Sequence, residues 1–457
     1  MKMKFNLKSA AALLAAASLV SPAFANDGAD SGKRFPHLDH VFLIMMENHG
    51  YYQVLGNPNE AYLNSLIANK KVNLATNYFA VGHPSLTNYL EIVGGSNFGI
   101  RSDNSPIWGD TSCTTNLSSG IVNADNDAGN APVPVDTGNV CPITGAGKDA
   151  ETPAVDTWNE VSTPPSLGGT PPFYNYLADI DGFKSVPQAF TVGRSIADQL
   201  EEAGKTWKTY QESLPLGGAY GVDNSNGTAS NLTDFTDLAP LTLNDVVALY
   251  AVKHNPFAYF LNVEVGDGIH NVVGFDGPRG LYADLATGHI PSFSYIVPNQ
   301  CDDQHGKSGA GAFCAADPGS DGLQAGLNPG LIQQGDVTIQ RLVEGIKSSR
   351  VWHEGSNAIV IVWDENDYSG LTNPPAGYNP PQTLTGQFPP QNQNKVVLTV
   401  ETNYCNSHGV QSTNYYNSFS LLRSLEAGFR VPCLNHACDP GVSAMTDLFG
   451  SSDNGNW

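Results

Sequence analysis

The chain has 457 residues and a formal net charge of −22, with 22 basic residues against 44 acidic ones. Its length exceeds the roughly 250 to 300 residues that one hydrophobic core usually supports, but no clean linker divides it. The acidic balance and the lack of a basic run argue against nucleic-acid binding, because a polyanion would be repelled. We therefore expect a small substrate and no nucleic-acid partner.

The first 25 residues have the pattern of a secretory signal. Three lysines precede an apolar stretch from Ala10 to Val20, and Ala23-Phe24-Ala25 provides a small-residue cleavage site. The alternative is a buried N-terminal helix; a lasting membrane anchor would need a longer apolar stretch. We expect cleavage after Ala25, a periplasmic or secreted protein without a stable membrane anchor, and a single domain over 26–457.

Two apolar runs far apart in the chain both stop at acidic residues. Val41 to Met46 is followed by Glu47-Asn48, and Ala358 to Trp363 is followed by Asp364-Glu365. Runs of this length are typical of strands buried on both faces, and open α/β sheets bind ligands at the carboxyl ends of such strands. Neighbouring carboxylates would repel each other unless a cation lay between them, so the pattern predicts a metal site.

Helical and strand patterns alternate along the rest of the chain. This order predicts an α/β fold with a mostly parallel central sheet and helices on both faces. Apolar spacing predicts helices at 85–93, 193–203, 243–253 and 331–348, and apolar runs predict strands at 205–210, 257–261, 293–298 and 396–400. The stretch 101–187 is rich in Gly, Pro, Asp, Ser and Thr, and we interpret it as a long insertion that forms a lid or rim.

Seven cysteines in an exported chain indicate disulfides. Proximity in the sequence suggests pairing of Cys113 with Cys141, of Cys301 with Cys314, and of Cys433 with Cys438. Cys405 is left over, as a plain buried thiol or as a metal ligand or reactive thiol near His408.

Four stretches supply candidate metal ligands. They are Glu47 and Asn48 after the first strand, Asp302 and His305 after the strand at 293–298, Asp364 and Glu365, and His408 after the strand at 396–400. Carboxylates with imidazoles suit zinc, manganese or iron, whereas carboxylates with Asn alone would suit calcium or magnesium. We expect one or two divalent ions. Simple helix capping or ion pairing by these acids is the alternative, which the scarcity of basic residues disfavours.

Ser85 is the candidate nucleophile. Pro84 and the apolar spacing from Leu86 to Val93 place it near a helix N-terminus, which favours an anion. Coordination to a metal can activate a hydroxyl, and Asn48 or Asn88 can stabilise developing oxygen charge. His83 either assists the phosphoryl transfer or braces the serine turn. Taken alone, a serine at this position is usually a helix cap.

Several motifs together resemble the secreted bacterial phosphoesterase family of acid phosphatases and phospholipases C, within the alkaline-phosphatase-like superfamily. They are Met-Met-Glu-Asn-His, His-Pro-Ser-Leu-Thr-Asn-Tyr, Lys-His-Asn-Pro-Phe, Pro-Asn-Gln-Cys-Asp-Asp-Gln-His and Val-Trp-Asp-Glu-Asn-Asp. The resemblance implies metal binding by Glu47, Asn48, Asp364 and Glu365, and transient phosphorylation of Ser85. It implies a second ligand group of Asp302, His305 and His408, in which Asp303 could replace Asp302.

These observations predict an exported, metal-dependent acid phosphatase that hydrolyses phosphate monoesters through a phosphoserine intermediate. One alternative within the same family is a phospholipase C or another phosphodiesterase; the short tail after Gly428 favours the phosphatase. A different class of protein, a non-catalytic export protein that binds metal or carbohydrate, would leave Ser85 and the histidines without a role.

Overall fold

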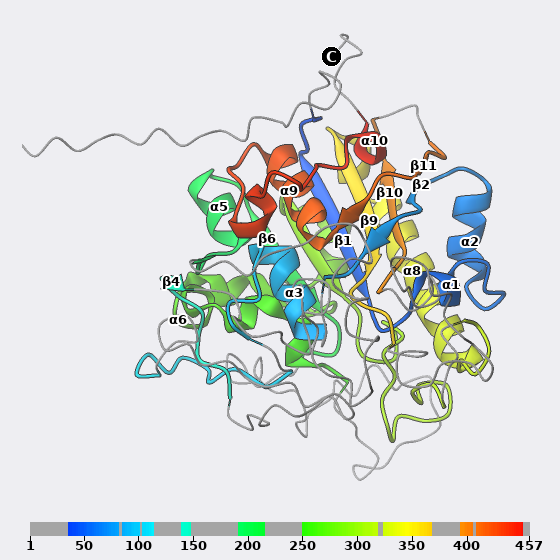
Figure 1. Cartoon of the computed structure of the whole chain (residues 1–457), viewed down its shortest axis with the longest axis horizontal. Coiled ribbons are helices and arrows are strands. Elements are labelled where there is room, and N and C mark those ends of the chain that lie inside the picture. The colour runs from blue at the N-terminus through cyan, green and yellow to red at the C-terminus, as the bar shows by residue number, and fades with distance from the viewer. Residues whose placement is uncertain are drawn as a thin grey trace, which may run out of the picture.

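The structure is a computed structural model of the chain (Figure 1). It describes residues 35–81, 85–100, 103–113, 139–147, 191–214, 249–318, 323–367, 394–404 and 408–450. The signal expected at 1–25, most of the insertion expected at 101–187, His83 and Cys405 lie outside the described residues. Within them, no helix combines the length and the apolar character that a membrane crossing would require.

An eight-stranded sheet forms the centre of the molecule, in the order β11-β2-β10-β9-β1-β8-β6-β7. Every neighbouring pair is parallel except the two that involve β10, which runs antiparallel to β9 and to β2. The strands are β1 (His40–Met46), β2 (Asn73–Ala75), β6 (Trp207–Gln211), β7 (Val272–Val273), β8 (Phe293–Val297), β9 (Asn357–Trp363), β10 (Leu398–Thr402) and β11 (Gln411–Ser412).

Helices cover both faces of this sheet. All seven residues of β9 are buried, and because successive side chains of a strand point to opposite faces, neither face is open to water. Figure 1 shows α3 and α9 in front of the sheet and α8 behind it; α3 packs against α9, and α8 packs against α2 and α7. The predicted mostly parallel α/β fold is thus confirmed.

The α-helices vary widely in length. They are α1 (Tyr51–Val54), α2 (Ala61–Ala68), α3 (Ser85–Gly94), α5 (Ile196–Glu202), α6 (Leu261–Val265), α7 (Leu281–Thr287), α8 (Pro329–Ser348), α9 (Ser418–Phe429) and α10 (Thr446–Phe449). The two long helices begin at asparagine caps, because Asn328 accepts a hydrogen bond from the Gly330 N–H and Asn417 accepts one from the Ser420 N–H.

Short elements complete the described part of the chain. Two small sheets pair β3 (Tyr78–Phe79) with β12 (Tyr416–Asn417) and β4 (Ala146–Gly147) with β5 (Thr191–Val192). Five 3₁₀ helices are η6 (Val252–His254), η7 (Pro256–Tyr259), η8 (Asp267–Asn271), η9 (Val351–His353) and η11 (Asn435–Cys438). The strand predicted at 257–261 is wrong. Pro256 opens a 3₁₀ turn there, and a short buried apolar run does not distinguish a strand from a helix.

Three disulfides join the pairs that the sequence suggests. They are Cys113 with Cys141, Cys301 with Cys314, and Cys433 with Cys438. The second closes the loop that follows β8, so it constrains the segment that carries Asp303 and His305. The first joins the two described parts of the predicted insertion, 103–113 and 139–147.

Candidate active site

The register of β1 against β9 brings two acidic segments to one edge of the sheet. Met46 pairs with Trp363, so Glu47 and Asp364 leave neighbouring parallel strands together. The Asp364 N–H donates to the Met46 carbonyl over 3.0 Å, and the Asn48 N–H donates to Asp364 Oδ1 over 3.1 Å. Asn48 has a φ of 53°, a left-handed conformation that asparagine tolerates better than most residues. The expected meeting of the two acidic segments is therefore present.

Ser85 lies between two buried carboxylates. It is the first residue of α3, and its Oγ is 3.0 Å from Glu365 Oε1 and 3.2 Å from Glu47 Oε2. One turn further along α3, Asn88 Nδ2 donates to Glu365 Oε2 over 3.1 Å, and the Tyr89 hydroxyl donates to Glu47 Oε1 over 2.5 Å. The first turns of α3 thus hold the serine and orient both acids around it.

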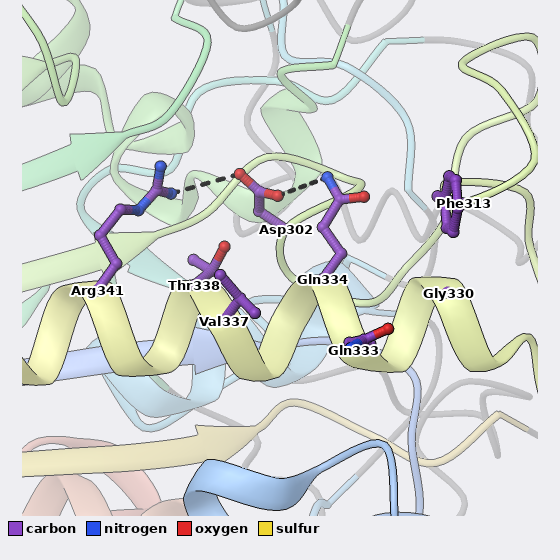
Figure 2. Close-up of a pocket in the computed structure, with 8 residues that line it drawn as sticks. All are labelled: Asp302, Phe313, Gly330, Gln333, Gln334, Val337, Thr338 and Arg341. Carbon is purple, nitrogen blue, oxygen red and sulfur yellow. Dashed lines mark hydrogen bonds and ion pairs between the residues drawn. The ribbon is translucent and has the colours of Figure 1, made fainter. Parts of the chain in front are cut away.

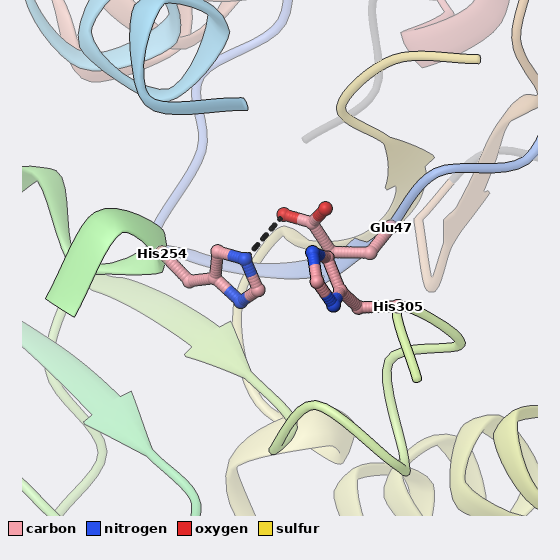
Figure 3. Close-up of side chains that lie close together, drawn as sticks. All are labelled: Glu47, His254 and His305. Carbon is pink, nitrogen blue, oxygen red and sulfur yellow. Dashed lines mark ion pairs between the residues drawn. The ribbon is translucent and has the colours of Figure 1, made fainter. Parts of the chain in front are cut away.

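Two histidines lie beside the Glu47 carboxylate (Figure 3). His254 Nε2 lies 3.1 Å from Glu47 Oε1, and its Nδ1 lies 3.1 Å from Asp303 Oδ2. Its ring stacks on Tyr89, with 5.4 Å between ring centroids. His305 Nδ1 is 2.8 Å from the Gly306 carbonyl oxygen, and its Nε2 is 3.2 Å from Lys253 Nζ. Glu47, His254 and His305 each present a potential ligand atom, all within 4.8 Å of one another.

The electrostatics of the site favour bound positive charge. Burial raises the pKa of Glu47, and the charges of Asp364 and Glu365 raise it further. Burial likewise raises the pKa of Asp303, with Glu47 as the next cause, and that of Asp364, with Glu365 as the next cause. Lys253 opposes all three shifts. One lysine does not balance this group of carboxylates, so the site would be stabilised by a cation.

Both histidines of the site are held in the neutral form. Burial lowers the pKa of His254, and burial together with the charge of Lys253 lowers the pKa of His305 to about 3. Neutral imidazole is the form that binds metals. Burial alone would lower the pKa of Lys253, but the carboxylates of Asp103 and Glu47 outweigh that effect and raise it, so the ammonium group stays charged.

The donors of this site fit a divalent metal ion. Asp364 Oδ2 is buried and has no hydrogen-bond partner among the described residues, which is unusual for a carboxylate oxygen unless a ligand completes its contacts. Carboxylate oxygens and neutral imidazole nitrogens from Glu47, Asp364, Glu365, His254 and His305 together form a donor set suited to zinc or manganese. This chemistry supports the prediction of a divalent metal.

The structure gathers most of the predicted site residues in one place. Those that meet around Ser85 are Glu47, Asn48, His305, Asp364 and Glu365. Asp303, which the resemblance offered as a substitute for Asp302, is the aspartate that faces this group.

Asp302 points elsewhere, so its predicted place is corrected. It accepts a hydrogen bond from Gln334 over 2.7 Å and lies 3.4 Å from an Arg341 nitrogen, both on α8 (Figure 2). The tight turn after β8 sends the side chains of consecutive residues in different directions. Spacing along the sequence could not distinguish the two aspartates.

His408 is also not brought to the cluster. The prediction assumed that the preceding strand ran parallel to the others, but β10 is antiparallel to β9, with Thr402 opposite Ala358 at the start of β9. The chain that leaves β10 therefore emerges at the amino edge of the sheet. There His408 is exposed and precedes β11, which pairs parallel with β2.

Sequence reasoning missed four residues that shape the site. They are His254, Tyr89, Lys253 and Asp103, none of which was predicted to be a site residue. Three of the four lie in motifs that carry the family resemblance, Lys-His-Asn-Pro-Phe and His-Pro-Ser-Leu-Thr-Asn-Tyr, and this was the signal that could have found them. Nothing in the local sequence marks Asp103.

His49 supports the loop that carries Glu47. Its Nδ1 is 3.0 Å from the Glu47 carbonyl oxygen, and its Nε2 is 2.9 Å from Asp317 Oδ2. Burial lowers the pKa of His49, but Asp317 outweighs burial and raises it. The pair fastens the Glu47 loop to the segment that precedes α8.

Several proteins of assigned function resemble parts of the chain. Among proteins of assigned function it is 33% identical over 89 residues to a phosphatidylinositol-3-phosphatase of Mycobacterium tuberculosis, 29% identical over 141 residues to a probable acid phosphatase of Kluyveromyces lactis, and 28% identical over 131 residues to an acid phosphatase of Aspergillus fumigatus. These alignments cover 20, 29 and 28% of this chain and only 28, 28 and 24% of the respective relatives.

Solved structures resemble the chain more distantly. An alkaline phosphatase superfamily protein from Vibrio parahaemolyticus aligns with a TM-score of 0.40 and 12% identity, over 92% of this chain and 71% of that one. The lipoteichoic acid synthase LtaP from Listeria monocytogenes aligns with a TM-score of 0.41 and 10% identity, over 93 and 78%.

The model of the phosphoesterase family matches residues 59–316 and 328–432 of this chain. This match includes Ser85, both site histidines, Asp303, Asp364 and Glu365. The chain belongs to the phosphoesterase family, the class of phosphoric ester hydrolases that the sequence predicts.

Proposed function

We propose that the protein is an exported, metal-dependent acid phosphatase that hydrolyses small phosphate monoesters through a phosphoserine at Ser85. The observation that carries the proposal is the position of the Ser85 hydroxyl, at the first residue of a buried helix and within 3.2 Å of two buried carboxylates. The names of the two fungal relatives also favour acid phosphatase activity. The net negative charge of the chain disfavours a nucleic-acid partner. Its disulfides are compatible with the periplasm or the exterior of the cell, after cleavage near Ala25.

In the first step Ser85 attacks phosphorus. Glu365 Oε1, the nearest carboxylate oxygen, accepts the proton of the hydroxyl as the new O–P bond forms. The bond from phosphorus to the leaving oxygen breaks, and that oxygen takes a proton from solvent and departs as the alcohol. The backbone dipole of α3 favours the negative charge that gathers at its N-terminus. A bound divalent ion, held by the site carboxylates and imidazoles, would supply Lewis-acid stabilisation of phosphoryl oxygens and a lower pKa for the hydroxyl. His83 stays a candidate for assisting this step.

In the second step water attacks phosphorus and loses a proton to solvent, the bond from phosphorus to Ser85 Oγ breaks, and Glu365 returns its proton to that oxygen, which restores the hydroxyl. Asn48 and Asn88 lie beside the carboxylates and orient them during both steps. Each step inverts the configuration at phosphorus, so two successive steps give overall retention.

The test compares two substrates and two variants. Purified protein is analysed for bound metal, then assayed with p-nitrophenyl phosphate and with p-nitrophenylphosphorylcholine, before and after chelation. We expect turnover of the monoester, its loss on chelation and its restoration by one of zinc, manganese or calcium. Ser85→Ala should abolish turnover, and Ser348→Ala, at the exposed end of α8, should not.

Other outcomes identify the alternatives. Preference for the choline diester would indicate a phospholipase C or another phosphodiesterase. Metal binding without hydrolysis of either ester would indicate a non-catalytic binding protein and would overturn the proposal.

A further inference from the structure

Lys253 is a partly buried cation at the edge of the acidic site. It precedes His254, its side chain is only 16% exposed, and its Nζ lies 2.8 Å from Asp103 Oδ2 and 3.2 Å from His305 Nε2. An ammonium group has three N–H donors, and these two are its hydrogen-bond partners among the described residues. In the metal-loaded protein the His305 Nε2 lone pair binds the ion and no longer accepts from Lys253, so of these two contacts only that with Asp103 occupies a donor, and the other donors are available to a ligand.

Asp103 links Lys253 to the helix that carries the nucleophile. Its Oδ2 accepts a hydrogen bond from the Lys253 ammonium group, and its Oδ1 accepts a hydrogen bond from the Leu86 N–H over 3.1 Å. Leu86 directly follows Ser85 at the start of α3. A single carboxylate thus fixes the lysine and the first turn of the nucleophile helix relative to each other.

The charge of Lys253 acts on the whole site. This charge opposes the rise in pKa that burial causes for Glu47, Asp303 and Asp364, so the ammonium group lies within electrostatic reach of all three carboxyl groups. A phosphate monoester dianion would bring two more negative charges into this group of carboxylates. A fixed cation that is linked through Asp103 to the first turn of the nucleophile helix is the kind of group that binds such a phosphoryl oxygen.

We propose that Lys253 binds a non-bridging oxygen of the substrate phosphoryl group, and that Asp103 is the positioning residue that holds Lys253 and the first turn of α3 together. This inference rests on the proposed phosphatase function, which supplies the phosphoryl group.

A second lysine and aspartate provide a matched control. Lys208 pairs with Asp284 beside β6 and α7, and their side chains are 17 and 8% exposed. Lys253 and Asp103 are 16 and 30% exposed. A lysine with a purely structural role should behave like Lys208 when it is replaced.

The decisive experiment measures the binding of inorganic phosphate by calorimetry to the metal-loaded wild type and to the Lys253→Met, Lys253→Arg and Lys208→Met variants. Loss of one charge-assisted hydrogen bond should weaken binding on the order of 100-fold in Lys253→Met. Lys253→Arg should recover part of the affinity, and Lys208→Met should bind like the wild type. Metal content should stay equal in all four proteins.

Two results would overturn the inference. One is wild-type phosphate affinity in Lys253→Met with a full complement of metal. The other is loss of metal from Lys253→Met, because Lys253 would then maintain the metal site and not bind the substrate. Since phosphate binding needs no turnover, the measurement decides the role of Lys253 even if the wild type hydrolyses neither ester, a result that would refute only the proposed function.

Kinetics of Asp103 variants separate its two contacts. Asp103→Asn keeps an oxygen acceptor for the Leu86 N–H but loses the charge that holds Lys253, so KM for p-nitrophenyl phosphate should rise while kcat changes little. Asp103→Ala loses both contacts and should also lower kcat, because the first turn of α3 no longer holds Ser85 in place. Equal kinetics of Asp103→Asn and wild type would contradict the positioning role.

Discussion

Asp302 and Asp303 are adjacent in the sequence but lie in two different environments. Asp303 is fully buried beside His254 and Glu47, where each added carboxylate raises the pKa of its neighbours. Asp302 lies in an open surface pocket of about 310 Å³ beside α8, with the exposed apolar side chains of Phe313 and Val337.

Counterions and donors account for the difference. Asp302 accepts a hydrogen bond from Gln334 and shares Arg341 with Glu212, and because Arg341 is partly exposed, water also screens these charges. Around Asp303 the carboxylates outnumber the cations, and that imbalance is what creates affinity for a metal ion. An acidic residue type alone therefore does not identify a metal site. The excess of buried carboxylates over cations does.

The largest expected effect separates the buried cluster from the pocket beside α8. Ser85→Ala removes the nucleophile and should lower kcat on the order of 10⁴-fold or more, because the remaining groups cannot form the phosphoserine. Gln334→Ala alters the pocket and should leave kcat within about twofold of the wild type. Steady-state assays with p-nitrophenyl phosphate measure both. A large loss of kcat in Gln334→Ala would indicate that the chemistry takes place in the pocket beside α8 and not in the buried cluster around Ser85.

The next comparison replaces each aspartate by the isosteric amide. Asp303→Asn removes the charge beside His254 and should lower metal affinity or activity about 10- to 100-fold, as loss of a residue that orients metal ligands does. Asp302→Asn should leave activity unchanged and cost at most about 1 kcal/mol of stability, since its ion pair with Arg341 is partly exposed. Metal titration and thermal melts test both variants. Equal effects at the two positions would remove the distinction between the two aspartates.

The smallest expected effect is a dependence of stability on pH in the metal-free protein. Burial raises the pKa of Glu47, Asp303 and Asp364, so above about pH 4 the folded chain holds protons that the unfolded chain has lost. The unfolded state then binds fewer protons, and the free energy of unfolding falls as pH rises towards neutrality. A bound cation stabilises the ionised form and should flatten this slope. Melting temperatures with and without metal between about pH 4.5 and 7 measure the difference; parallel curves would contradict it.

Much of the site could be predicted because buried strands have a clear pattern. The apolar runs before Glu47 and Asp364 identify two central strands, and parallel strands bring the residues at their carboxyl ends to one edge of the sheet. The same argument placed His408 wrongly, because it assumed that the strand before His408 runs parallel to the others. The direction of β10 depends on the whole sheet and cannot be inferred from the residues of β10 alone.

Other features depend on contacts that no local pattern contains. The choice between Asp302 and Asp303 depends on the turn after β8 and on Arg341 of α8. His254 reaches Glu47 from a short 3₁₀ helix, and the Lys-His-Asn-Pro-Phe motif marks the histidine without indicating which carboxylate it contacts. Asp103 joins Lys253 across about 150 positions of sequence.

The central claim is that a cation held by the carboxylates around Ser85 lets that hydroxyl displace the alcohol from phosphorus. The most direct test is the stereochemical course of hydrolysis of a phosphate monoester made chiral with oxygen isotopes. Two displacements through a phosphoserine predict retention of configuration at phosphorus. Net inversion would show direct attack by water and would contradict the account.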